Sequence, residues 1–140
     1  MVRLAKLEDA DKLYELNALF NGEALTTIDN IRVSLLDNKQ EIVVVKEVDN
    51  NLVGFLCAQI KRSFCYREVW AEITELYVKP EYRKQGFAKE MIMFIEDYLF
   101  KHHNIVKFEI LTGRNNLIAQ EVYGKLGYQE DNEIHLRKII

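Results

Sequence analysis

A basic turn that contains one glycine is the feature of this sequence best suited to bind an anion. The turn, Arg83 to Ala88, reads Arg-Lys-Gln-Gly-Phe-Ala and stands directly before a stretch with helical periodicity. The N-terminus of a helix leaves backbone N–H groups unpaired and carries a partial positive charge. Gly86 permits close approach of the backbone, and Arg83, Lys84 and Lys89 add cations around the turn. The turn therefore predicts a phosphate site, against the alternative of a solvated basic loop before an ordinary helix.

Two carboxylates precede the turn on a stretch that predicts a strand, Val69 to Val78. Side chains of a regular strand alternate between its faces, so Glu72 shares a face with Leu76, whereas Glu75 shares the other with Tyr77. A β-bulge would bring both carboxylates to one side. Either could accept a proton beside the anion site. For each, the alternative is a solvent-facing charge or a partner of a lysine or arginine.

The spacing of apolar residues predicts the elements that position these groups. Strands are expected over residues 2–5, 42–45, 52–60, 69–78, 107–112 and 134–140, and helices after Asp9, after Thr26 or Thr27, from Phe87 to Leu99 and from Asn116 to Leu126. The turn Asp49-Asn50-Asn51 predicts a hairpin, and Pro80 ends the strand before the basic turn. The predicted fold class is α+β, with helices around a largely antiparallel sheet.

The bulk composition is that of an ordinary globular chain. Its 140 residues are 49% hydrophobic and 29% charged, which predicts one domain over residues 1–140. The net charge of -3 argues against a nucleic-acid or anionic-membrane partner and mildly favours a cationic substrate. The first residues show neither a secretory leader nor a membrane span, so a cytoplasmic protein is expected. Cys57 and Cys65 lack metal-ligand spacing, so we expect reduced thiols and no metal.

Two segments of the chain resemble the signature of one superfamily, the GCN5-related N-acetyltransferases (GNAT). The first runs from Glu75 to Ala88 and contains the basic turn. The second has the spacing of that family's later helix and following strand, and it consists of Asn116, Ala119, Tyr123, Leu126, Gly127 and Tyr128. The order of predicted elements also fits the family fold, although the first third of the chain carries no specific motif.

This resemblance implies a central, mostly antiparallel mixed sheet, flanked by about four helices, whose fourth and fifth strands splay apart to receive acetyl-CoA. In the family, backbone amides at the end of the fourth strand hold the pantetheine arm and the acetyl carbonyl, which here implicates Leu76, Tyr77 and Val78. The residues then expected around the phosphates are Arg83, Lys84, Gln85, Gly86, Phe87, Ala88 and Lys89. Acetyl-CoA is thus the expected cosubstrate.

The resemblance also implies catalytic roles. Counting back from the turn, Glu72 matches the base of histone-acetylating members, and acidic residues near Glu75 occur in other members, so Glu72 is the first choice of base. Tyr123 stands where many relatives place a tyrosine near the cofactor sulfur, and it is expected as the general acid, with a core aromatic as the alternative. Asn116 is expected either to hydrogen-bond the pantetheine amide or to cap its helix.

Direct transfer of acetyl from acetyl-CoA to a primary amine of a small molecule or protein is the leading functional hypothesis. The alternative is a non-catalytic acyl-CoA-binding sensor or regulatory module, which would have no chemical need for Glu72 or Tyr123. Relatives in this family include monomers and dimers, so a homodimer is left open. The sequence does not name the acceptor amine or the acyl-chain preference beyond acetyl.

The acceptor is expected to bind at the region of the first two helices and at the loop Lys61 to Glu68. Glu23, Asp29 and Asp37 offer negative charge for a cation in the helical region, although a solvated surface is the preferred interpretation of these residues. The aromatic segment Arg62 to Trp70 either lines the acceptor pocket or serves core or dimer packing.

Overall fold

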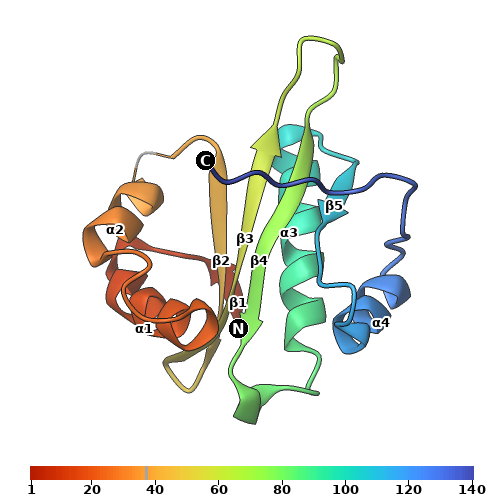
Figure 1. The fold of residues 1–140 in the computed structure, drawn as a ribbon. Helices are drawn as coiled ribbons and strands as arrows, with labels where there is room; N and C mark the ends of the chain where they lie inside the picture. Colours follow the sequence, from red (N-terminus) through yellow and green to blue (C-terminus); the bar gives the residue numbers. More distant parts are fainter. Residues whose placement is uncertain (37) are drawn as a thin grey trace.

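A five-stranded sheet runs through the centre of the computed structural model, which describes residues 1–36 and 38–140 (Figure 1). Its strands lie in chain order: β1 (Val2–Leu4), β2 (Glu41–Val48), β3 (Asn51–Lys61), β4 (Trp70–Val78) and β5 (Phe108–Ile110). Neighbouring strands from β1 to β4 are antiparallel, whereas β4 and β5 are parallel. The expected α+β class with a mostly antiparallel mixed sheet is confirmed.

Helices cover both faces of this sheet (Figure 1). Two of them, α1 (Ala10–Asn21) and α2 (Ile28–Leu36), pack on one face, and α3 (Phe87–His103) packs on the other. The fourth helix of the described residues, α4 (Leu117–Lys125), lies on the β5 side. A short 3-10 turn, η1 (Leu7–Asp9), leads into α1, and a second, η2 (Pro80–Tyr82), follows β4.

The two faces of the sheet carry separate hydrophobic clusters. Under α1 and α2, the helical residues Leu13 and Leu16 pack on Phe55 and Tyr77 of the strands. On the other face, buried side chains of α3 pack on β3 and β4; they are Met91, Ile92, Ile95 and Leu99 against Leu56, Ala58, Ala71 and Ile73. Full burial of one such large side chain contributes about 1.5–3 kcal/mol, so this contact fixes α3 against the sheet.

Gly54 on β3 allows α3 and β4 to approach closely. A Cβ at this position would lie 2.7 Å from the carbonyl oxygen of Tyr77 and 3.3 Å from Cε of Met91. Any side chain would therefore push β4 or α3 away. The glycine thus helps to hold the start of α3 next to the carboxyl end of β4.

Strands β4 and β5 are paired only at one end. Their register joins residues 71–73 of β4 with residues 108–110 of β5, whereas β4 continues to Val78. From Thr74 onward, the edge of β4 that faces β5 has no neighbouring strand among the described residues. The strands therefore separate in the direction of the basic turn, as the splayed arrangement expected from the resemblance requires.

The predicted last strand, Ile134 to Ile140, is wrong. The structure shows no regular element over residues 129–140, and Leu136 and Ile140 are exposed. An alternating apolar pattern describes a surface that fits a sheet, but a strand also needs a partner edge, and β5 pairs only with β4 in the described residues. No helix in the described part of the chain is both long and apolar enough to cross a membrane.

Candidate functional site

The basic turn is held against the end of β4 by its own arginine. Nε of Arg83 donates a hydrogen bond to the carbonyl oxygen of Val78 at 2.8 Å, and its guanidinium carbon lies 5.7 Å from the ring centroid of Tyr77. The backbone then passes through the left-handed region at Lys84 (φ 63°) and at Gly86 (φ 82°). Arg83 is therefore committed in part to shaping the turn, in addition to any contact with an anion.

Six consecutive backbone N–H groups, those of residues 84–89, have no hydrogen-bond acceptor within the described chain. The first amide of α3 with a partner is that of Glu90, which donates to the carbonyl oxygen of Gly86 at 3.0 Å. Successive N–H groups in a turn that passes through the left-handed region can form a concave anion site, and the helix N-terminus adds its partial positive charge. This run of free donors makes residues 84–89 the candidate anion site.

The side chains of the turn divide into anchors and free cations. Phe87 and Ala88 are half-buried and pack against the α3 face of the sheet, so only their amides can reach a bound anion. Lys84 and Lys89 are exposed and form no ion pair among the described residues. Gln85 is also exposed. The structure thus gives the turn both preorganised backbone donors and mobile positive charge.

The open edge of β4 presents backbone donors next to the turn. Lys79 donates to the carbonyl oxygen of Val53 on β3 at 2.8 Å. N–H groups of an antiparallel strand alternate in direction, so the amide of Tyr77 points toward β3, whereas those of Leu76 and Val78 point toward the gap beside β5. Of the three amides expected to hold an acyl-pantetheine arm, Leu76 and Val78 are therefore in position, and Tyr77 contributes its buried ring.

A β-bulge at Thr74 places both candidate carboxylates on the same face of the sheet. Cys57 of β3 is opposite Glu75, and Ala58 is opposite Ile73, so Thr74 has no partner on β3. Gln59 is opposite Glu72. Because Cys57 and Gln59 lie two residues apart, their partners share one face, the one that α1 and α2 cover. Regular alternation is thus wrong here, and the bulge is the arrangement that occurs.

The two carboxylates differ in their surroundings. Glu72 forms an ion pair with Nζ of Lys61 and is only 12% exposed, so its charge is already neutralised. Glu75 has no ion pair among the described residues and lines a cavity of about 170 Å³ between the sheet and α1 and α2. Burial raises the pKa of the Glu75 carboxyl; a hydrogen bond from Asn21 opposes this rise, and the charge of Glu41 adds to it.

The cavity beside Glu75 is mostly apolar. Its strand side is formed by Val43, Phe55 and Cys57, and its helix side by Leu13, Ile31 and Leu35, with polar groups from Asn17, Thr26, Asn30 and Ser34. Burial raises the pKa of the Cys57 thiol, so this cysteine is a neutral wall residue. Glu75 is the carboxylate of this cavity, and an amine that enters it meets that group.

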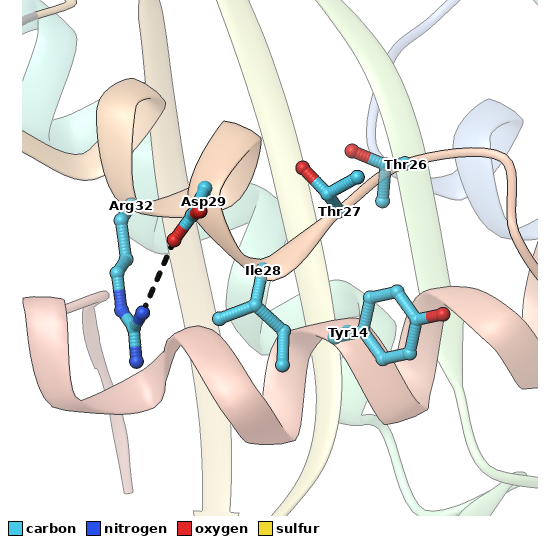
Figure 2. Close-up of a pocket in the computed structure, with 6 residues that line it drawn as sticks. All are labelled: Tyr14, Thr26, Thr27, Ile28, Asp29 and Arg32. Atoms are coloured by element: carbon cyan, nitrogen blue, oxygen red, sulfur yellow. Dashed lines mark hydrogen bonds and ion pairs between the residues drawn. The ribbon is translucent and has the colours of Figure 1, made fainter.

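A second cavity, of about 460 Å³, lies outside the first between α1 and the start of α2 (Figure 2). Thr26 lines both cavities. Asp29, one of the acidic residues expected to attract a cation, is paired with Arg32 at 3.3 Å. Glu23 is exposed, and Asp37 lies outside the described residues. Because Arg32 offsets its charge, Asp29 attracts a cationic acceptor less strongly than expected.

The aromatic loop between β3 and β4 projects beyond the sheet (Figure 1). The side chain of Phe64 is fully exposed, and Tyr66 is exposed with its ring 6.3 Å from that of Trp70 in an edge-to-face arrangement. None of the three lines either of the two cavities. Neither core packing nor lining of these cavities therefore explains Phe64.

On α4, Tyr123 and Asn116 occupy different positions. Tyr123 is half-buried against the α3 side of the sheet, 6.4 Å from the ring of Tyr128, and burial raises the pKa of its phenol. Oδ1 of Asn116 accepts the amide of Ala119 at 3.2 Å, so Asn116 caps α4, which was one of its two expected roles. The cap leaves the side-chain N–H groups of Asn116 without an acceptor in the described chain.

Glu109 is a further carboxylate beside Glu72 that the sequence patterns did not single out. It is directly paired with Glu72 in the parallel register of β4 and β5, so the two carboxylates share a face. Its own ion pair with Lys107 spans 3.5 Å, and its side chain is less buried than that of Glu72. Only the strand register reveals this neighbour, because the two residues lie far apart in the sequence.

Comparison with known proteins gives a consistent family. The model of the Acetyltransferase (GNAT) family matches residues 7–128. A Bacillus subtilis (strain 168) protein with the provisional name ribosomal protein bS18-alanine N-acetyltransferase is 30% identical over 128 residues, which cover 91% of this chain and 80% of the relative. Spermidine N(1)-acetyltransferase of Vibrio cholerae serotype O1 is 29% identical over 98 residues, 70% of this chain and 54% of the relative.

The fold has solved counterparts. The crystal structure of ribosomal-protein-alanine N-acetyltransferase from Brucella melitensis biovar Abortus 2308 matches with a TM-score of 0.83 and covers 99% of this chain and 98% of that chain. Its sequence identity is 19%, so this likeness concerns the fold.

Glu75→Gln is expected to have a higher free energy of unfolding than the wild type at pH 7. Near pH 4 the difference between the two proteins should disappear. A carboxyl with a raised pKa binds its proton more tightly in the folded chain than in the unfolded chain, so stability falls as pH rises from the unfolded to the folded pKa. Urea denaturation at the two pH values measures the difference. Glu72→Gln, which removes an ion pair, is the control and should gain nothing; an equal offset for Glu75→Gln at both pH values would contradict the assignment.

Proposed function

Because the chain belongs to the Acetyltransferase (GNAT) family, whose named relatives are N-acetyltransferases, we propose that it transfers an acetyl group from acetyl-CoA directly to a primary amine. The observation that carries this proposal is the run of six free N–H groups at residues 84–89, because a pyrophosphate needs several such donors. The amine belongs to a small molecule or to a protein. Acetyl-CoA supplies an activated acetyl thioester to the site.

The residues present fit this cosubstrate along its length. The amides of residues 84–89 donate to the pyrophosphate, with the ammonium groups of Lys84 and Lys89 nearby. The open edge of β4 accepts the pantetheine arm, and the free side-chain N–H groups of Asn116 add a donor from α4. The amides of Leu76 and Val78 donate toward the acetyl carbonyl oxygen as it gains negative charge.

Glu75 is the proposed general base. A primary amine is protonated at neutral pH, and it must lose a proton before its lone pair can attack the thioester carbon. A carboxyl with a raised pKa is a better proton acceptor than an ordinary one, and Glu75 lines a partly open, mostly apolar cavity that an amine can enter. Glu72 was the first choice from the sequence. Its ion pair with Lys61 makes it the weaker candidate.

Tyr123 is the proposed general acid. When the new bond between the amine nitrogen and the acetyl carbon forms, the bond between carbon and sulfur breaks, and the departing thiolate takes up a proton. The phenol of Tyr123 stays protonated at neutral pH because burial raises its pKa, so it can donate that proton and regain one from water. The ammonium nitrogen loses two protons in all, one through Glu75 before the attack and one to water after the new bond has formed. The thiolate gains one proton from Tyr123, so the net reaction releases one proton.

A turnover screen tests the proposed function. The wild type should release CoA thiol from acetyl-CoA in the presence of an accepted amine, and Gly86→Glu should weaken acetyl-CoA binding at least about tenfold, since it adds a negative charge and strains a left-handed residue. Gly22→Glu is the control, because Gly22 also has a positive φ (110°) and no atom within 4 Å of its Cβ position, and it lies at the end of α1. Normal affinity in a folded Gly86→Glu variant would contradict the turn assignment. Binding without turnover across the amines would favour a sensor.

Acid–base variants separate the proposed roles. Glu75→Gln and Tyr123→Phe should each lower kcat by about 10²–10⁴-fold, with acetyl-CoA affinity retained, whereas Glu72→Gln should lower it less than about tenfold. Since the base acts when it is deprotonated, wild-type activity should fall as pH drops through the raised pKa of Glu75. Steady-state kinetics across pH provides the measurement. Full activity in Glu75→Gln together with a large loss in Glu72→Gln would reverse the two assignments.

A further inference from the structure

A buried lysine of β2 contacts the first turn of α3. The side chain of Lys46 is 8% exposed, and its Nζ lies 2.6 Å from Oε2 of Glu90. The same Nζ lies 4.2 Å from the ring centroid of Phe87. Both partners belong to the first turn of α3: Phe87 is one of the residues 84–89 with free amides, and Glu90 directly follows them. The lysine thus links the sheet to the start of the phosphate site.

The strand pairing creates the path for this side chain. Lys46 is directly opposite Gly54, and Gly54 is opposite Val78 at the end of β4. Because Gly54 has no side chain, the lysine can extend over β3 toward α3. Burial of an ammonium group is strongly unfavourable unless the group is paired. Lys46 therefore needs Glu90 as its ion-pair partner, which distinguishes this pair from an incidental surface pair.

Glu90 creates an electrostatic conflict at the site. A carboxylate in the first turn of a helix stabilises the helix through its dipole. The same negative charge stands within a Debye length, about 8–10 Å, of donors that must bind an anion, so when it is unpaired it repels that anion. Among the charged groups of the described residues that face this point, Lys46 is the one that pairs with Glu90. The amino group of Met1 also lies near both, and Glu47 lies near Met1.

We propose that Lys46 is a positioning residue for cofactor binding. Through its ion pair, Lys46 cancels the repulsion of Glu90 toward the pyrophosphate that the amides of residues 84–89 bind. This inference rests on the proposed function, because the anion is the pyrophosphate of acetyl-CoA. Lys46 itself does not contact the reacting atoms.

A double-mutant cycle tests the inference through CoA affinity, measured by calorimetry at low salt. Lys46→Met should weaken CoA binding at least about tenfold, because the charge of Glu90 is then unpaired. Glu90→Gln alone should bind at least as tightly as the wild type, and Lys46→Met with Glu90→Gln should return to within about threefold of it. At saturating acetyl-CoA, kcat should be unchanged in all three, so the effect appears in KM. Lys101→Met, which breaks the exposed pair with Asp97 at the other end of α3, is the control and should leave affinity unchanged.

The cycle distinguishes charge neutralisation from a purely structural role. If Lys46 only supported packing, the double variant would bind as weakly as Lys46→Met, and that result would overturn the inference. Should Lys46→Met not fold, Glu90→Gln still decides, because a tenfold loss of affinity in this variant would overturn the inference. Failure of the wild type to bind CoA would overturn the proposed function itself, whereas normal wild-type binding with an unaffected Lys46→Met overturns only the role of Lys46.

Discussion

The proposed phosphate site requires that the amides at the start of α3 stay free of acceptors within the described chain, and much of the structure around them meets this requirement. The hydrogen bond from Arg83 to the carbonyl oxygen of Val78 ties the turn to β4, and the backbone passes through the left-handed region at Lys84 and Gly86. These donors lie at the surface, where water satisfies them until a ligand replaces it. The site is therefore preorganised by backbone geometry, with side-chain charge as an addition.

The two faces of the sheet position different parts of the candidate site. On the α3 face, apolar packing and the close approach at Gly54 fix the height of the helix above β4, and the early end of the pairing with β5 leaves an open edge beside it. On the opposite face, regular alternation with Tyr77 places Glu75 at the cavity under α1 and α2, and the bulge at Thr74 brings Glu72 to the same face. An acyl group on the open edge of β4 and an amine in this cavity would thus approach β4 from different sides.

Local residue preferences allowed part of this arrangement to be predicted from the sequence. The turn, the strand before it and the helix after it follow from Pro80, Gly86 and the periodicity of apolar residues, and the cap of α4 follows from the preference of asparagine for that position. Contacts between distant segments could not be read in this way. The bulge that brings Glu72 to the same face as Glu75 depends on the register with β3, and the pair of Lys46 with Glu90 joins residues 44 positions apart. The prediction of a last strand was wrong for the same reason, because a strand needs a partner edge from another segment of the chain.

An NMR titration of the ¹⁵N-labelled chain with CoA tests the central claim most directly. The account predicts that the largest amide shifts occur at residues 84–89 and at Val78, where the free N–H groups lie. The amide of Tyr77, which points toward β3, should shift less than those of its neighbours and serves as an internal reference. Shifts concentrated in the cavities of α1 and α2, with residues 84–89 unchanged, would contradict the assignment of the turn as the phosphate site.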